Sequence, residues 1–192
     1  GPDPRPGGAR AHRHDAGGGR FPSTREQGYK ILVNVYAKKN YWHVRRMVTD
    51  HDDANDVVQN CFVKIWKGLP DFRQDSKLYT WVYRIATNES ITFINEKYRR
   101  SSIALETEGE SYTSHLKTDP WFDGDETKRQ LQLAIDSLPD KQKQVFVMRY
   151  YDEMKYEEME AILGTTTGAL KASYHHAVKK IEIFLKERLN QI

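Results

Sequence analysis

The sequence of 192 residues contains a single cysteine, Cys61, and no long apolar run. One thiol cannot close a disulfide within the chain, and neither a Cys-x-x-Cys nor a His-Glu-x-x-His spacing occurs. These absences argue against a disulfide-stapled secreted domain and against a structural zinc site. The apolar runs, such as residues 145–148, are far shorter than the roughly 18 residues of a membrane-spanning helix. We therefore expect a cytoplasmic protein with no direct membrane insertion.

The sequence also lacks the residue patterns on which most enzymes depend. It shows no nucleophile with a base and no glycine-rich phosphate loop. Glu157, Glu158 and Glu160 would point in different directions on a helix, which is more typical of a solvated face than of a catalytic pair. His175 and His176 are consecutive and face differently, which argues against paired metal ligation. We expect no enzymatic activity, no cofactor and no metal site.

The net charge of +3 is small but unevenly distributed along the chain. Residues 21–101 carry +5 and residues 126–192 carry +1, whereas residues 102–125 between them carry −5. That acidic segment has glycine and proline but little periodicity, as a flexible linker should. Residues 1–20 are rich in glycine, proline and arginine, and we expect a disordered leader or expression-derived segment there. The sequence thus predicts two small domains, 21–101 and 126–192, joined by a linker.

The first block shows the clearest helical pattern. Between Asp56 and Leu69 the apolar residues recur with a period near 3.6, and Pro70 ends the pattern. After a polar loop, apolar residues return at helical spacing from Leu78 to Ala86. Two shorter stripes precede Asp56, at residues 31–36 and 44–48. We expect an N-terminal helical bundle.

The second block predicts a helix-turn-helix. A short helix over residues 156–163 is followed by Gly164 as its C-terminal cap and then by a long amphipathic stripe from Leu170 to Leu185. Either Thr165 or Thr166 would cap the second helix. No segment alternates with period two for long enough to indicate a sheet. The predicted fold is therefore all-α, and a plain helical hairpin is the alternative to a DNA-binding motif.

Aromatic and cationic residues interleave between residues 72 and 100. Cations neutralise phosphates and exposed rings stack unpaired bases, so this composition suits single-stranded nucleic acid. Trp81 shares the apolar stripe of its helix and is more typical of a core residue. Tyr79 and Tyr83 lie off that stripe, and we expect them to be the exposed stacking residues.

Two stretches resemble the extracytoplasmic-function (ECF) group of bacterial sigma factors. Residues 53–66 and 72–88 are similar to their region 2, and residues 138–171 are similar to their region 4. The resemblance spans about residues 22–188. It implies a transcription initiation factor that binds core RNA polymerase, through the beta-prime clamp helices and the beta flap, and that recognises promoter DNA. It also implies regulation by an anti-sigma factor, often a membrane-anchored one.

The resemblance assigns three groups of residues. The polymerase-binding group comprises Asp56, Val57, Gln59, Asn60, Phe62 and Trp66. The group that captures and melts the minus-ten element comprises Phe72, Arg73, Lys77, Tyr79, Thr80, Trp81, Tyr83, Arg84 and Asn88. The group for the duplex minus-thirty-five element comprises Thr166, Thr167, Gly168, Lys171, Ser173, His175 and His176. The chain departs from the family at Asn60, where glutamate is common, and at Ser173 and His176, where arginines are frequent.

Two other functions compete with a sigma factor on this sequence. A stand-alone helix-turn-helix regulator would bind specific duplex DNA without polymerase, and it would need a sensor or dimerisation domain. A pair of protein-interaction bundles, such as an anti-sigma-like adaptor, would bind no DNA. The first block has no ligand-pocket signature and carries aromatics suited to single strands, which favours the sigma factor.

Overall fold

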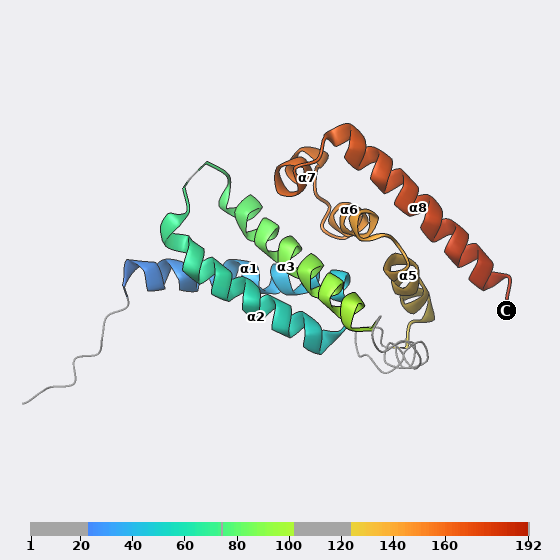
Figure 1. The fold of residues 1–192 in the computed structure, drawn as a ribbon, viewed down its shortest axis with the longest axis horizontal. Coiled ribbons are helices and arrows are strands. Elements are labelled where there is room, and N and C mark those ends of the chain that lie inside the picture. Colours follow the sequence, from blue (N-terminus) through green and yellow to red (C-terminus); the bar gives the residue numbers. More distant parts are fainter. Residues whose placement is uncertain (1–22, 74, 102–123, 192) are drawn as a thin grey trace, which may run out of the picture.

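The computed structural model describes residues 23–73, 75–101 and 124–191. The first module consists of α1 (Thr24–Val48), α2 (His51–Gly68), the 3-10 turn η1 (Leu69–Asp71) and α3 (Leu78–Ser101). The second module consists of α5 (Glu126–Asp136), α6 (Asp140–Tyr150), α7 (Tyr156–Leu163) and α8 (Thr167–Leu189). Every regular element among the described residues is a helix, which confirms the all-α prediction (Figure 1). The expected leader and nearly all of the expected linker lie outside the described residues.

Helix α1 differs from its prediction, because the two short stripes belong to one helix of 25 residues. A capping box begins it: the Ser23 side chain accepts from the Glu26 backbone amide, and the Glu26 carboxylate accepts from the Ser23 amide. Between the stripes the chain contains neither glycine nor proline, so nothing interrupts the helix. There, Asn40 and His43 are fully buried. Because these buried residues are polar, apolar spacing alone predicted two separate segments and not one continuous helix.

The core of the first module follows the predicted stripe of α2. Leu32, Phe62, Ile65 and Val82 form one buried cluster between α1, α2 and α3. Pro70 stands in η1 directly after α2, as the end of the apolar pattern predicts. This packing fixes where the N-terminal end of α3 lies.

The predicted helix-turn-helix is present in the second module as α7 and α8. Gly164 ends α7 in the left-handed conformation, with φ of 65°, a region that glycine enters without steric cost. Thr166 caps α8 by accepting a hydrogen bond from the Ala169 backbone amide. Leu170 is fully buried beside Met159 and Ile162, so α8 packs on α7 through its first turn.

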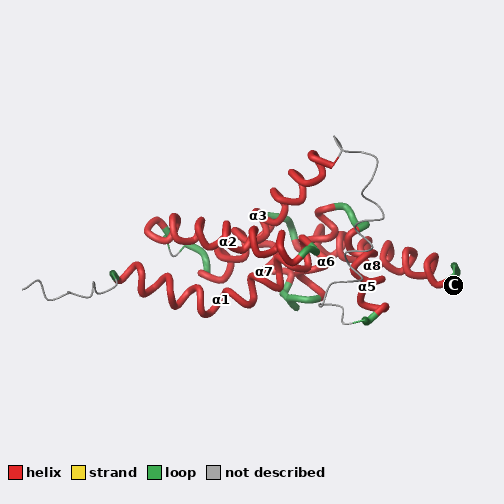
Figure 2. Tube along the Cα trace, turned by 90° about the horizontal axis from the view of Figure 1, so that it is seen from below, coloured by secondary structure: helices red, strands yellow, loops and turns green. Residues whose placement is uncertain are grey.

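The two modules are packed against each other and share a core. Val44 and Met47 of α1 belong to the same buried cluster as Val147 of α6 and Ala177 of α8. Helix α3 contacts α7, and α1 contacts α6, so the second module covers one side of the first (Figures 1 and 2). The sequence predicted two modules but contained no sign of this interface.

Among the described residues, no helix combines the length and the apolar character that crossing a bilayer would require.

Candidate nucleic-acid interface

The N-terminal half of α8 presents an exposed polar face. Gly168, Lys171 and His175 are exposed and follow each other at i, i+3 and i+7, so they lie on one side of the helix. His176 is also exposed at the edge of this face, and Thr166 is exposed at the N-cap before it. A helix held in this way can enter a major groove with its first residues toward the base edges.

Two other predicted residues of α8 are less available. Thr167 is half-buried, and its hydroxyl donates to the Glu160 carboxylate at 2.9 Å, which ties the start of α8 to α7. Ser173 is half-buried on the side of the helix that faces the module. Sequence reasoning missed Ala172 and Lys179, which are exposed at i+4 and i+11 from Gly168 and so extend the same face. Their helical spacing was the available signal.

The start of α3 brings four predicted aromatic residues into two pairs. The rings of Phe72 and Trp81 lie 5.0 Å apart, and those of Tyr79 and Tyr83 lie 4.6 Å apart. Trp81 is half-buried against the Leu32–Phe62 cluster, as its place on the apolar stripe predicts. It passes so close to Gly68 that a Cβ there would lie 3.0 Å from the indole.

The tyrosine pair has a different environment from the one expected. Tyr83 is 4% exposed, and it belongs to a buried cluster that contains Met154 and Met159 of the second module. Tyr79 is half-buried beside the same cluster. The expectation that Tyr83 is exposed was therefore wrong, because its spacing reports only that it lies off the core of its own module.

Burial raises the pKa of the Tyr79 hydroxyl to about 12, and the nearby carboxylates of Glu158 and Asp152 add to the shift. The pKa of Tyr83 is raised further, again mainly by burial and then by Asp152. Asp152, which acts on both tyrosines, and Glu158, which acts on Tyr79, belong to the second module. The electrostatic environment of the pair therefore depends on the contact between the modules.

The remaining predicted minus-ten residues are divided between surface and interface. Arg73, Lys77 and Asn88 are exposed, whereas Thr80 is 6% exposed and lies in the packed part of α3. Arg84 is half-buried, and its guanidinium donates to the backbone carbonyl of Ala161 at 2.6 Å. The structure thus does not gather all nine residues on one free surface.

The predicted polymerase-binding residues of α2 also include both exposed and buried side chains. Asp56, Gln59 and Asn60 are exposed on the outer face, while Val57 and Phe62 are 2% and 9% exposed in the core. The half-buried Trp66 has the Arg25 guanidinium 3.9 Å from its ring centre.

Sequence reasoning missed Val63, which is 49% exposed on the outer face of α2 beside Asn60. Val63 lies three residues after Asn60 and so extends the exposed face of α2. The position of Val63 in the sequence, outside the apolar stripe that faces the core, was the signal that could have identified it.

Comparisons with known proteins connect these surfaces to one family. The family model "Sigma-70 region 2" matches residues 32–100, and the model "Sigma-70, region 4" matches residues 128–181. The ECF RNA polymerase sigma-E factor of Escherichia coli K12 is 31% identical over 165 residues, which cover 82% of this chain and 86% of the relative. The chain belongs to the ECF sigma factors of the sigma-70 family.

Another curated relative agrees with that membership, and two solved structures share the fold. The ECF RNA polymerase sigma factor SigW of Bacillus subtilis is 29% identical over 170 residues, which cover 84% of this chain and 91% of the relative. The sigma factor RpoE of Bartonella quintana, solved with the anti-sigma factor NepR, has the same fold, with a TM-score of 0.67, 21% identity and coverage of 83% of this chain and 98% of that one. CnrH, solved with the cytosolic domain of CnrY, gives a TM-score of 0.61 at 20% identity and covers 84% and 89% of the two chains.

The sigma factor thus contains both region 2 and region 4, and it serves promoter recognition and transcription initiation. The matches to region 2 and region 4, together with the sigma-E relative, support a sigma factor over the stand-alone helix-turn-helix regulator and the adaptor. No group of three or more histidine, cysteine, aspartate or glutamate side chains within the described ranges could hold a metal ion.

Proposed function

We propose that the start of α3 captures the opened minus-ten strand, with Tyr79 and Tyr83 as the stacking rings. The observation that carries this proposal is that neither ring belongs to the apolar clusters of its own module, although both are large and paired. Arg73 and Lys77 are exposed just before them and would neutralise the backbone phosphates. Bases held against the rings cannot pair again, so binding itself drives opening.

The face of α8 that contains Gly168, Lys171 and His175 would read the minus-thirty-five duplex in the major groove. Lys171 supplies a cation for a phosphate or a base edge, and Thr166 offers a hydroxyl at the helix start. The expected second domain, residues 126–192, carries only +1, which predicts weak binding by this domain alone. Attachment to polymerase would raise its local concentration at the promoter.

The exposed face of α2 would bind core polymerase through Asp56, Gln59 and Asn60. Val57 and Phe62 would then act by fixing α2 in the core rather than by touching polymerase. Asn60 brings an amide where a charged residue is common in the family, so this interface would depend less on salt. An anti-sigma factor that covers the same face would block assembly of the holoenzyme.

We also propose that the sigma factor catalyses no reaction itself and acts in the cytoplasm, where polymerase and promoter meet. Sequence patterns for a nucleophile or a phosphate loop are absent. Polymerase would supply the chemistry, and this chain would supply the choice of start site.

The test of this proposal is the pair of substitutions Tyr79→Ala and Tyr83→Ala in one chain. A promoter is first selected from a library by run-off transcription with purified core polymerase. Strand opening on it is then measured by permanganate footprinting, and polymerase binding by native gel shift. We expect opening to fall by at least tenfold while polymerase binding is retained, because loss of two stacked bases at roughly 1–3 kcal/mol each removes more than tenfold.

Tyr98→Ala is the matched control, since Tyr98 lies on the same helix but is 62% exposed at its far end. The control should open the promoter like the wild type. Unchanged opening in the double variant would refute the stacking role of the two tyrosines.

A further inference from the structure

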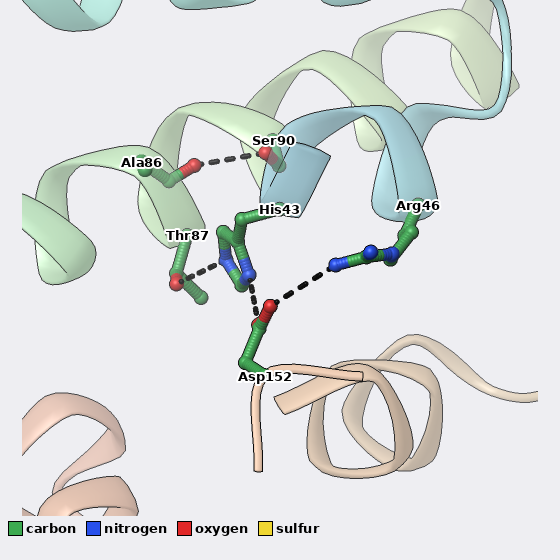
Figure 3. Close-up of polar contacts among 6 residues, drawn as sticks. All are labelled: His43, Arg46, Ala86, Thr87, Ser90 and Asp152. Atoms are coloured by element: carbon green, nitrogen blue, oxygen red, sulfur yellow. Dashed lines mark hydrogen bonds and ion pairs between the residues drawn. The ribbon is translucent and has the colours of Figure 1, made fainter. Parts of the chain in front are cut away.

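Asp152, in the turn after α6, joins the two modules through a buried polar cluster (Figure 3). One carboxylate oxygen lies 2.7 Å from Nδ1 of His43, and the other accepts from Nη1 of Arg46 at 3.3 Å. The other ring nitrogen of His43, Nε2, lies 3.0 Å from the hydroxyl of Thr87. His43 is completely buried, and the Asp152 side chain is 7% exposed. The second module thus supplies one side chain to a site whose other three members belong to the first.

Further polar contacts bridge the same interface. Asp136 of α5 accepts from the Thr49 hydroxyl at 2.9 Å, and Thr49 is buried just after α1. Arg84 donates to the carbonyl of Ala161 at the other end of the interface, as described above. Buried polar groups are costly unless each finds its partner, so these contacts specify one arrangement of the modules.

This arrangement covers the proposed strand-capture surface. Tyr83 belongs to the same buried cluster as Met154 and Met159, so its ring offers no free face to a base, and Tyr79, which is paired with it, is half-buried beside that cluster. Asp152 also places negative charge near both hydroxyls, and Glu158 adds negative charge near that of Tyr79, which a DNA phosphate would avoid. The arrangement described here therefore leaves no room for bases to stack on both rings of the pair.

We propose that this structure is a self-inhibited state, in which Asp152 acts as a latch that holds the second module over the tyrosine pair. This inference rests on the proposed role of that pair. Release of Asp152 from His43 and Arg46 frees the start of α3 for DNA and lets the helix-turn-helix move toward its own element. A protein whose competent state is a minor fraction binds with an affinity reduced by that fraction, so the latch suppresses DNA binding by the free sigma factor.

The experiment compares the wild-type chain with Asp152→Ala, which removes the partner of both His43 and Arg46. Asp53→Ala is the matched control, because Asp53 pairs with Lys97 at 2.9 Å within the first module. Asp152→Asn keeps the side-chain volume and one acceptor, and it serves if the alanine variant fails to fold. All variants also carry Cys61→Ala, so that two new cysteines can be labelled selectively. These cysteines, Asn95→Cys in α3 and Glu182→Cys in α8, carry the spin labels, and both positions are exposed.

Two measurements are made on each chain. Pulsed electron paramagnetic resonance gives the distance between the labels, and fluorescence anisotropy gives the affinity for a short randomised single-stranded DNA. We expect one narrow distance for the wild type and the Asp53 control. For Asp152→Ala we expect a broad, longer distribution and DNA binding about tenfold tighter, with the asparagine variant between them.

The outcomes separate the latch from the stacking role. A wild-type distance that is already broad, or a narrow unchanged distance in folded Asp152 variants, would overturn the latch whatever the DNA result. A longer distance with unchanged DNA affinity would support the latch and refute the tyrosine pair as the strand-capture surface. A longer distance with tighter binding that Tyr79→Ala and Tyr83→Ala abolish would support both.

Discussion

Asp136 allows a direct test of how much a buried ion pair contributes to the stability of this sigma factor. Its carboxylate lies 2.8 Å from the ammonium of Lys143 on α6, and the same oxygen accepts from Thr49 and from Gln132 at 2.9 and 3.0 Å. The side chains of Asp136 and Lys143 are only 15% and 9% exposed. The carboxylate therefore serves three donors in a largely dry site.

Replacing Asp136 with alanine leaves the Lys143 charge buried without this partner. Removing one member of a buried ion pair costs about 3–5 kcal/mol, because the remaining charge stays desolvated. The loss of the acceptor for Thr49 and Gln132 acts in the same direction. We expect Asp136→Ala to lower the free energy of unfolding by about 3 kcal/mol, measured by urea denaturation with far-ultraviolet circular dichroism.

The control for Asp136 lies in the same module. Lys128 and Asp125 form an ion pair at 3.9 Å, but their side chains are 62% and 43% exposed. Lys128→Ala should change the free energy of unfolding by less than about 0.5 kcal/mol, since exposed pairs contribute little. A cost below about 1 kcal/mol for Asp136→Ala, or equal costs for both variants, would show that burial does not determine the strength of these pairs.

Three further outcomes follow from single residues. Burial raises the pKa of the Cys61 thiol from its usual 9.0 to about 12, so a disulfide reagent at pH 8 should label the thiol only after denaturation. The thiol's contribution to stability should be lost as the pH rises from about 9 toward 12, because the unfolded chain loses this proton first. Fast labelling of the folded chain would contradict this. Thr166→Ala removes the acceptor for the Ala169 amide and should lower the free energy of unfolding by about 1 kcal/mol in the same denaturation assay, whereas no change would show that α8 does not need the cap. Asn40 is fully buried and neither polar atom of its side chain has a hydrogen-bond partner, so Asn40→Leu should raise the thermal midpoint, with a gain of about 1 kcal/mol; a lowered midpoint would indicate a polar role for the amide.

Apolar periodicity predicted the elements that pack within a module. The stripe of α2 gave Val57, Cys61 and Ile65 as inward residues, and all three are buried. The turn of the helix-turn-helix was predicted from Gly164 and the threonines after it, because a left-handed cap and a hydroxyl N-cap are local requirements of the backbone. Such features depend on neighbours in sequence, so the sequence reveals them.

The contact between the modules could not be predicted in this way. His43 and Asp152 are 109 residues apart, and each alone is an ordinary polar residue in an amphipathic segment. Tyr83 was correctly placed off the stripe of its helix, but a helical period cannot say whether solvent or a second module covers the other face. The placement of the site residues on their helices was therefore predictable, and their accessibility was not.

The latch has a thermodynamic consequence for how the proposed surfaces of the sigma factor act together. Any ligand that binds only the open arrangement must overcome the same closing free energy, whether it contacts α2, the start of α3 or α8. The first such ligand to bind overcomes it, and a second one that also needs the modules apart then binds an open chain, so the two would strengthen each other's binding by the same factor. Because that factor cannot exceed the ratio of closed to open chain in the free protein, Asp152→Ala should reduce the cooperativity as it increases the affinity for DNA alone. Loss of cooperativity and gain of affinity are thus two measures of one equilibrium, and they should change by matching amounts.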